Sequence, residues 1–329
     1  MRYAMVILGM AGLLGTGATG CIVQESSSNA DKFREGIPSQ DEVKLEEPVA
    51  ASGTQGPQSF ELGMGVQDDS TGGLAYATYY RFTREMFDGV NLGTAAILGS
   101  VWIIVNYPPT TLEDEEAIWG PWTEALSPAE YRFRATEVAQ DEYDYALEAR
   151  AKNTDDEWRA VWLGQGFGND HPDHHAGWFE LDFDAANEVD PTRLNAEEES
   201  GKVRVTYDLR AYPTTIRAYM TEQTSDAWFD ITLTTNQDGG GRVDIDALDD
   251  IEDEKNTQKE DIAMRSRWLA TGAGRADVTI ANGDLPEGTI VNASECWSSS
   301  FERVFWTDNI GIESEEGSVA ACAFEDAEY

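Results

Sequence analysis

The chain has 329 residues, of which 62 are acidic and 23 are basic, so that its net charge is −39. This balance excludes nucleic acid as a natural partner, because binding to phosphates depends on lysine and arginine. It also argues against docking to an anionic membrane through protein charge, and it favours a solvated, colloidally stable surface.

Residues 1–20 have the pattern of a secretory signal peptide. A basic start at Arg2 is followed by an apolar run over residues 4–14 and then by small residues. A positively charged start, a short apolar core and small residues at the cleavage site define such a signal. The pattern predicts export, and an oxidising compartment for the mature chain.

Cys21 directly follows Ala18, Thr19 and Gly20, and this order resembles the lipobox of bacterial lipoproteins, although Ala18 stands where that family usually has leucine. The resemblance implies cleavage before Cys21, lipid modification of Cys21 that includes palmitate, and anchoring in a membrane. Ile22 in place of aspartate implies sorting to the outer membrane, on either its periplasmic or its surface side. The alternative is an ordinary signal peptide with a chance cysteine.

Three further stretches extend this resemblance to most of the mature chain. They are F-T-R-E-M-F-D-G-V-N-L-G-T-A at residues 82–95, R-S-R-W-L-A-T-G-A-G-R-A-D-V at residues 265–278 and S-E-C-W-S-S-S-F-E-R-V-F-W at residues 294–306. With them the chain is similar to a group of uncharacterised Gram-negative lipoproteins. No activity is assigned to that group, so the resemblance implies no catalytic residue.

Residues 21–73 are predicted to be a lipid-anchored flexible tether. They are rich in Ser, Gly, Gln, Pro and acidic residues, and such a composition buries too little apolar surface to offset chain entropy. A flexible coil of about 50 residues reaches about 40 Å on average. One short helical turn is expected at residues 31–35, and residues 74–329 are expected to form a single β-rich domain.

Residues 79–107 read as the one long helix. Its uncharged part, residues 92–107, is about 16 residues long, whereas about 20 apolar residues are needed to cross a bilayer. Pro108 follows Tyr107 and ends the helix, because a residue before proline avoids the α region. The pattern predicts a core helix that shelters Ile97, Val101 and Ile104 against strands; the alternative is a membrane-inserting hairpin.

The rest of the chain alternates apolar and polar residues with the period of a half-buried strand. These segments are residues 117–122, 131–138, 143–150, 158–167, 179–184, 202–209, 215–220, 227–234, 242–247, 263–270, 277–281 and 301–306. Short, turn-rich connections favour antiparallel neighbours. We therefore expect a mainly β fold, an antiparallel meander curled into a barrel or half-barrel around the hydrophobic helix.

The three histidines of the chain fall together, which makes His171, Asp173, His174 and His175 a candidate metal site. The alternative is a polar hairpin loop between two strands. The acidic run containing Asp244, Asp246, Asp249 and Asp250 is a candidate calcium site, because calcium takes oxygen ligands. The alternative there is a strand that runs into a solvated acidic loop.

If Cys21 takes lipid, Cys296 and Cys322 remain as a pair, and a secreted context predicts a disulfide between them. No nucleophile elbow and no phosphate-binding glycine pattern occurs, so we predict no catalytic residue and no cofactor.

Three functions remain in consideration. The first is a non-enzymatic, lipid-anchored envelope protein that binds or scaffolds an unknown protein or envelope partner. The second is a carrier of a lipid or other hydrophobic ligand inside the curved sheet, which requires a cavity beside the helix. The third is a metal-dependent enzyme at the histidine loop, which requires imidazole nitrogens that converge on one point.

Overall fold

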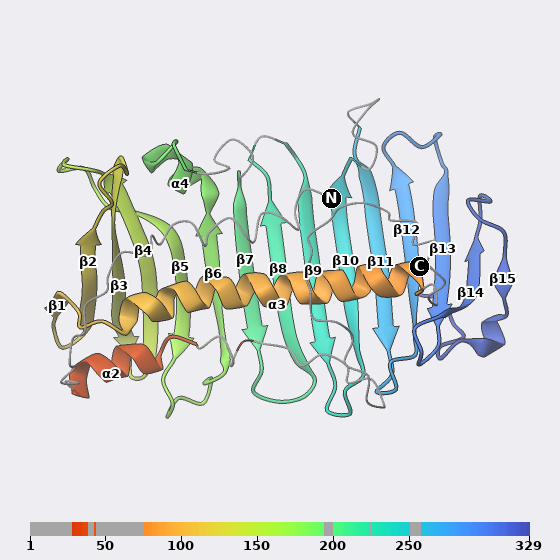
Figure 1. Cartoon of the computed structure of the whole chain (residues 1–329), viewed down its shortest axis with the longest axis horizontal. Coiled ribbons are helices and arrows are strands. Elements are labelled where there is room, and N and C mark those ends of the chain that lie inside the picture. Colours follow the sequence, from red (N-terminus) through yellow and green to blue (C-terminus); the bar gives the residue numbers. More distant parts are fainter. Residues whose placement is uncertain (1–27, 39–42, 44–75, 194–199, 224, 251–257) are drawn as a thin grey trace.

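A computed structural model describes residues 28–38, 43, 76–193, 200–223, 225–250 and 258–329 (Figure 1). One 15-stranded sheet makes up most of this part of the chain, and its strand order follows the sequence from β1 to β15. Each strand pairs antiparallel with the next. The prediction of a mainly β, antiparallel meander is therefore confirmed.

The strands are β1 (Thr111–Leu112), β2 (Glu116–Trp122), β3 (Ala129–Ala139), β4 (Glu142–Ala151), β5 (Arg159–Phe167), β6 (Ala176–Asp182), β7 (Lys202–Asp208), β8 (Thr214–Thr221), β9 (Trp228–Thr235), β10 (Gly241–Asp249), β11 (Glu260–Trp268), β12 (Gly274–Asn282), β13 (Ile290–Trp297), β14 (Arg303–Asp308) and β15 (Glu316–Gly317). Within the described residues three helices accompany them, α2 (Ser28–Glu35), α3 (Thr78–Val105) and α4 (Phe183–Val189), together with the short 3-10 helix η2 (Val319–Ala321). The alternation located twelve of the strands, whereas β1, β13, β15 and α4 were not predicted.

The sheet is open, so of the expected barrel or half-barrel the closed barrel is wrong. Among the described strands, β1 pairs only with β2 and β15 only with β14, and no ladder joins the two ends. Both edge strands are two residues long, and such short edges offer little template for pairing with another chain. Closure is also not needed to bury the apolar face, because a helix covers it.

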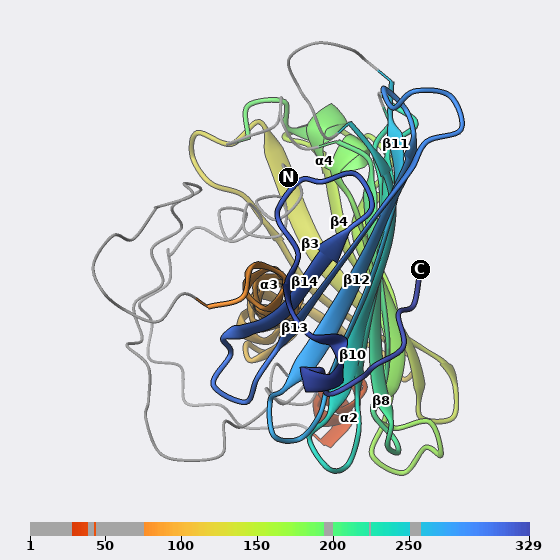
Figure 2. The same ribbon diagram turned by 90° about the vertical axis from the view of Figure 1, so that its right-hand side faces the viewer.

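Helix α3 runs across the strands on one face of the sheet, which we call the inner face (Figure 1, Figure 2). Ile97 and Val101 are buried in the core, and Ile104 is partly buried against it. Along the strands, alternate residues such as Val243 and Ile245 on β10 complete this core. The expected packing of the uncharged helix against strands of its own chain is thus confirmed.

Aromatic side chains fill the inner face at the β3–β6 end of the sheet. Trp162 stacks on Phe133 and Tyr145 with ring centroids 5.9 and 5.0 Å apart, and it also lies against Phe179. Helix α4 adds Phe183, which is 1% exposed. Residues 183 and 184, expected at the end of a strand, belong to α4 because Asp182 accepts a hydrogen bond from the Ala185 amide and caps it.

Opposite charges hold the two ends of α3. At its N-terminus the buried Glu295 carboxylate accepts hydrogen bonds from the amides of Thr78, at 3.0 Å, and Tyr79. At its C-terminus the Arg34 Nε donates to the Val105 carbonyl at 2.7 Å. A helix favours an anion at its N-terminus and a cation at its C-terminus, each typically by about 0.3–1 kcal/mol. These contacts therefore fix the helix along the sheet.

Arg34 comes from α2, so this part of the predicted tether is wrong. Phe33 is 0% exposed and Ile37 is 1% exposed, and both belong to the hydrophobic core. The short helical turn expected at residues 31–35 exists, but it is docked on the domain instead of lying free. The cause is tertiary, because Phe33 and Ile37 are too few to indicate burial from composition alone. Cys21 and most of the tether lie outside the described residues.

Candidate functional site

The histidine loop joins β5 to β6, as the hairpin alternative predicted. The His171 Nδ1 accepts a hydrogen bond from the Asp173 amide at 3.0 Å, and its ring stacks on Phe167 with centroids 4.5 Å apart. The His174 Nδ1 lies 3.2 Å from the Phe167 carbonyl oxygen. These nitrogens are thus directed at the loop's own backbone.

The metal site at His171, Asp173, His174 and His175 is therefore not formed. The Asp173 carboxylate forms an ion pair with Arg210 and lies 3.9 Å from the His171 Nδ1. Within the described ranges, no group of three or more His, Cys, Asp or Glu side chains is placed to hold a metal ion. The physical reason is the one that sequence spacing suggests: ligands adjacent in one loop satisfy local hydrogen bonds more readily than they converge.

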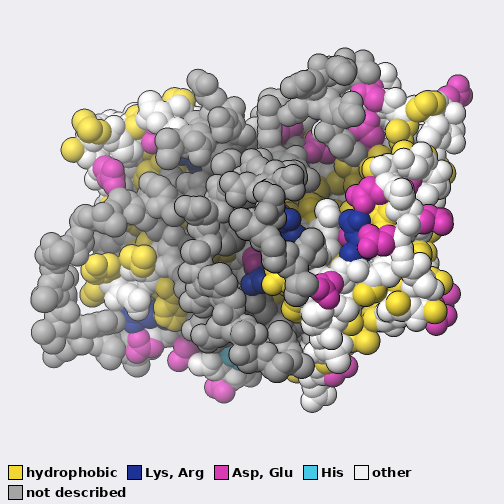
Figure 3. Space-filling model, turned by 45° about the vertical axis from the view of Figure 1, so that its right-hand side comes forward, with side chains coloured by type: hydrophobic (Ala, Val, Ile, Leu, Met, Phe, Trp, Pro, Cys, Tyr) yellow, Lys and Arg dark blue, Asp and Glu magenta, His cyan; other side chains and the backbone are white. Residues whose placement is uncertain are grey.

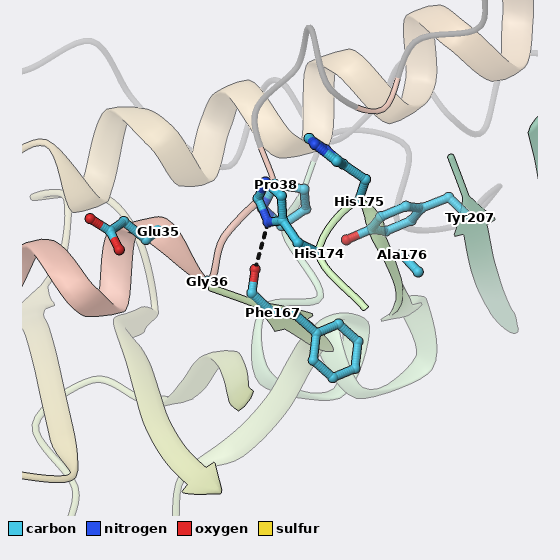
Figure 4. Close-up of a pocket in the computed structure, with 8 residues that line it drawn as sticks. All are labelled: Glu35, Gly36, Pro38, Phe167, His174, His175, Ala176 and Tyr207. Atoms are coloured by element: carbon cyan, nitrogen blue, oxygen red, sulfur yellow. Dashed lines mark hydrogen bonds between the residues drawn. The ribbon is translucent and has the colours of Figure 1, made fainter. Parts of the chain in front are cut away.

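A small pocket lies between this loop and the end of α2 (Figure 4). Its lining includes Glu35 and Pro38 from the α2 side, and His174, His175 and Tyr207 from the sheet side. Its volume is about 10 Å³, and a cavity needs about 10–15 Å³ to hold one water molecule. The pocket therefore suits a packing interface and not a substrate.

Glycines explain how closely α2 approaches the sheet beside this pocket. A Cβ added at Gly166 would lie 2.1 Å from the Gly36 carbonyl oxygen, and one added at Gly36 would overlap the Tyr143 ring. Any larger side chain at either position would push the two segments apart. Gly166 in β5 is the one residue of the strand that could have indicated this contact from the sequence.

The candidate calcium site on β10 is also not formed. Asp244 pairs with Arg242 at 2.6 Å, and Asp246 pairs with Arg265 at 2.6 Å. Burial raises the pKa of the Asp249 carboxyl, which lies at the strand end. Asp244, Asp246, Asp249 and Asp250 belong to no metal-binding group among the described residues. The reason is that Arg242 on the same strand and Arg265 on the neighbouring strand β11 pair with these carboxylates.

Such ion pairs continue along the face of the sheet turned away from α3, which we call the outer face. Arg132 and Arg134 on β3 both bind the Glu148 carboxylate on β4, at 2.6 and 3.0 Å. Similar pairs join Arg150 to Glu130, Lys202 to Asp182, Arg204 to Glu180 and Arg217 to Asp230. Basic residues of a strongly acidic chain are thus gathered where carboxylates flank them. On the part of the surface visible in Figure 3, too, basic side chains lie beside acidic ones.

Aromatic side chains lie among these pairs. The Trp158 ring lies against the guanidinium groups of Arg132 and Arg150, whose carbons are 4.6 and 4.4 Å from the ring centroid. Arg204 lies 3.9 Å from the centroid of Trp178. Arginine, tryptophan and tyrosine are the residue types most enriched at binding hot spots. The outer face is therefore the better candidate for a functional surface than the histidine loop.

Cys296 and Cys322 form a disulfide, with Sγ atoms 2.12 Å and Cα atoms 5.4 Å apart. This pairing agrees with the sequence prediction. Cys296 lies on β13 and is 0% exposed. The bond therefore ties the segment after η2 to the sheet.

By length and composition, α3 is the one helix within the described residues that would suffice to cross a membrane, and 47% of its most apolar window is buried. A core helix passes the same test, and α3 packs against the sheet.

Comparison of the chain with protein-family models, with curated proteins and with solved structures finds no match.

Proposed function

We propose that this chain is a lipid-anchored protein of the bacterial cell envelope, sorted to the outer membrane, and that it binds or scaffolds a partner without catalysing a reaction. The observation that carries the binding role is that the two faces of the sheet differ in what covers them. The inner face is occupied by α3, whereas the outer face presents paired arginines and aromatic rings.

The carrier alternative has less support. A carrier needs space between the helix and the sheet, but the side chains of α3 that face the sheet are packed there. Phe87, Leu98, Val101 and Val105 are at most 4% exposed and belong to the same core as the strands. The enzyme alternative loses its motivation because the histidine nitrogens do not converge.

The docked α2 shortens the distance at which a lipid anchor at Cys21 would hold the domain from the membrane. About seven residues separate Cys21 from the start of α2, and a fully extended chain of that length spans at most about 25 Å. The anchor would thus hold the domain near the lipid surface, not at the end of a tether that runs from Cys21 to residue 73.

The anchoring proposal is tested by expressing the full chain in a Gram-negative host and measuring the intact mass of the membrane-associated form. We expect a chain that begins at Cys21 and carries acyl groups. A Cys21→Ser variant should lose the acyl mass and leave the membrane fraction, while a Cys296→Ala/Cys322→Ala variant should keep both. An unmodified Cys21 in membrane-bound protein would overturn the proposal.

A further inference from the structure

Residues 323–329, which we call the strap, cross the outer face over β10–β13. Figure 2 shows this segment on the side of the sheet opposite α3. The disulfide at Cys322 ties its beginning to β13. The strap has no regular secondary structure, and Glu325, Asp326 and Ala327 are exposed. It therefore contacts the sheet mainly through side chains of the strands.

The sheet binds the main chain of the strap with a charged pair. The Arg275 Nη1 donates to the carbonyl oxygens of Phe324, at 3.2 Å, and Glu325, at 2.8 Å. The Asp277 Oδ2 accepts a hydrogen bond from the Glu328 amide at 3.0 Å. A donor and an acceptor on adjacent outer-face positions of β12 thus bind the main chain of the strap on both sides of a bend at Asp326.

Arg275 and Asp277 are buried, and they bind each other as well as the strap. The side chains of Arg275 and Asp277 are 3% and 0% exposed and lie 2.8 Å apart. Ser294 on β13 donates to Asp277 at 2.5 Å, and its hydroxyl also lies 2.6 Å from the Tyr329 hydroxyl. Burying an ion pair is seldom the most stabilising choice, since apolar residues of similar size often do as well or better. Since Arg275 and Asp277 also bind the main chain of the strap, we interpret this pair as a site that recognises a peptide.

Two side chains of the strap are recognised as well. The Glu328 carboxylate pairs with Arg242, at 3.0 Å, and with Arg267. The Phe324 ring lies 4.8 Å from the Arg267 guanidinium carbon. One acidic and one aromatic position, four residues apart, therefore add selectivity to the backbone contacts.

We propose that the outer face of β10–β13 is a peptide-binding site, that the strap occupies it in cis, and that its ligand in trans is an acidic peptide that adopts the conformation of the strap. The ligand carries an aromatic residue and a glutamate at the spacing of Phe324 and Glu328. A segment attached beside its own site competes at a millimolar effective concentration, so the strap keeps the site closed until it is displaced. This inference deepens the proposed binding role and rests on it, but it does not need the lipid anchor.

Hydrogen exchange on the full chain tests whether the strap opens. We expect the Glu328 amide to exchange through a local opening, at least tenfold faster than the amides of β12 and β13. Exchange of the strap and the strands at the same rate, through global unfolding only, would make the strap a permanent part of the sheet and overturn the proposal.

Peptide binding tests the site itself. A labelled peptide with the sequence of residues 324–329 is titrated into the full chain and into a Phe324→Ala/Glu328→Ala variant, with fluorescence anisotropy as the readout. We expect the variant, whose strap is loosened, to bind the peptide at least tenfold more tightly than the wild type. Equal or undetectable binding to both would overturn the proposal.

Matched variants separate recognition from general charge attraction. Adding Arg267→Gln to the loosened variant should weaken binding at least tenfold, whereas adding Arg217→Gln, an outer-face arginine of β8 that pairs with Asp230, should leave it unchanged. A peptide with lysine at the Glu328 position should not bind. Equal losses from both arginine variants would contradict a specific site. An unmodified Cys21 in the membrane-bound protein, which would overturn the anchoring proposal, would leave these results unaffected, so the two proposals fail separately.

Discussion

Glu295 shows how much a single buried carboxylate can organise. It is 0% exposed, accepts hydrogen bonds from the first amides of α3 and pairs with Arg303 at 2.6 Å. From the sequence it is an acidic residue among many, and it breaks the apolar alternation on the inner side of β13. Its role depends on where the start of α3 meets the sheet, which no local pattern reveals.

Replacing Glu295 with Gln should lower the free energy of unfolding by about 2–4 kcal/mol, because it removes the charge that the helix terminus and Arg303 stabilise. Urea denaturation followed by circular dichroism measures this loss. Glu313→Gln is the matched control, since Glu313 pairs with the same Arg303 but is 48% exposed, and it should change stability by about 0–1 kcal/mol. Equal effects of the two substitutions would contradict the capping role.

Asp308 gives a prediction about pH. Its carboxylate accepts hydrogen bonds from the amide of Glu313 and from those of Ile312, Ile310 and Gly311, which lower its pKa from the ordinary 3.8 to about 2. Because the folded pKa is the lower one, the loop at residues 308–313 is stabilised above pH 3.8 and loses that stabilisation as pH falls towards 2.

Nuclear magnetic resonance titration of the Gly311 amide between about pH 1.5 and 5 should therefore show a midpoint near 2. In an Asp308→Asn variant the amide should not titrate in this range. A midpoint close to 3.8 in the wild type would mean that these hydrogen bonds are not maintained in solution.

At the scale of elements, α2 is the least expected feature. It places Phe33 in the core and Arg34 at the end of α3. Phe33→Ala should open α2 locally, since loss of a buried phenylalanine side chain costs about 3–5 kcal/mol. Hydrogen exchange of residues 28–37 should accelerate strongly, while the exchange of β7–β10 stays unchanged.

Lys32→Ala is the control for this experiment. Lys32 lies in the same helix, but its side chain is 29% exposed and pairs with Glu137 instead of entering the core, so its removal should cost about 1 kcal/mol. If Phe33→Ala leaves the exchange of α2 as slow as in the wild type, the helix is not held by its core contacts.

At the scale of the whole molecule, the disulfide joins the end of the described chain to the sheet. It spans a sequence separation of 26 residues, for which loop-closure entropy predicts a stabilisation of about 3–4 kcal/mol. A Cys296→Ala/Cys322→Ala variant should show this loss in urea denaturation, whereas Cys21→Ala should not. An unchanged denaturation midpoint in the double variant would show that the bond does not constrain the unfolded chain.

In the folded molecule the charged residues are distributed unevenly over the surface. Composition predicts a repulsive, well-solvated surface, but the strands place most of their arginines on one face beside carboxylates. Exposed pairs contribute only about 0–1 kcal/mol each, so they stabilise the fold weakly. Their consequence is an outer face that differs chemically from the rest of the surface.

The sequence by itself determined the period-2 strands, their antiparallel order, the apolar helix and the cysteine pair, because each depends on local spacing or on simple arithmetic of residue types. Only the tertiary structure decided that the sheet stays open, that α2 is docked and that β13 is buried on both faces. It also decided that the histidines and aspartates bind backbone and arginine instead of a metal. These features depend on contacts between residues far apart in the chain, such as Arg34 with Val105 and Arg275 with Phe324, and local periodicity contains no information about them.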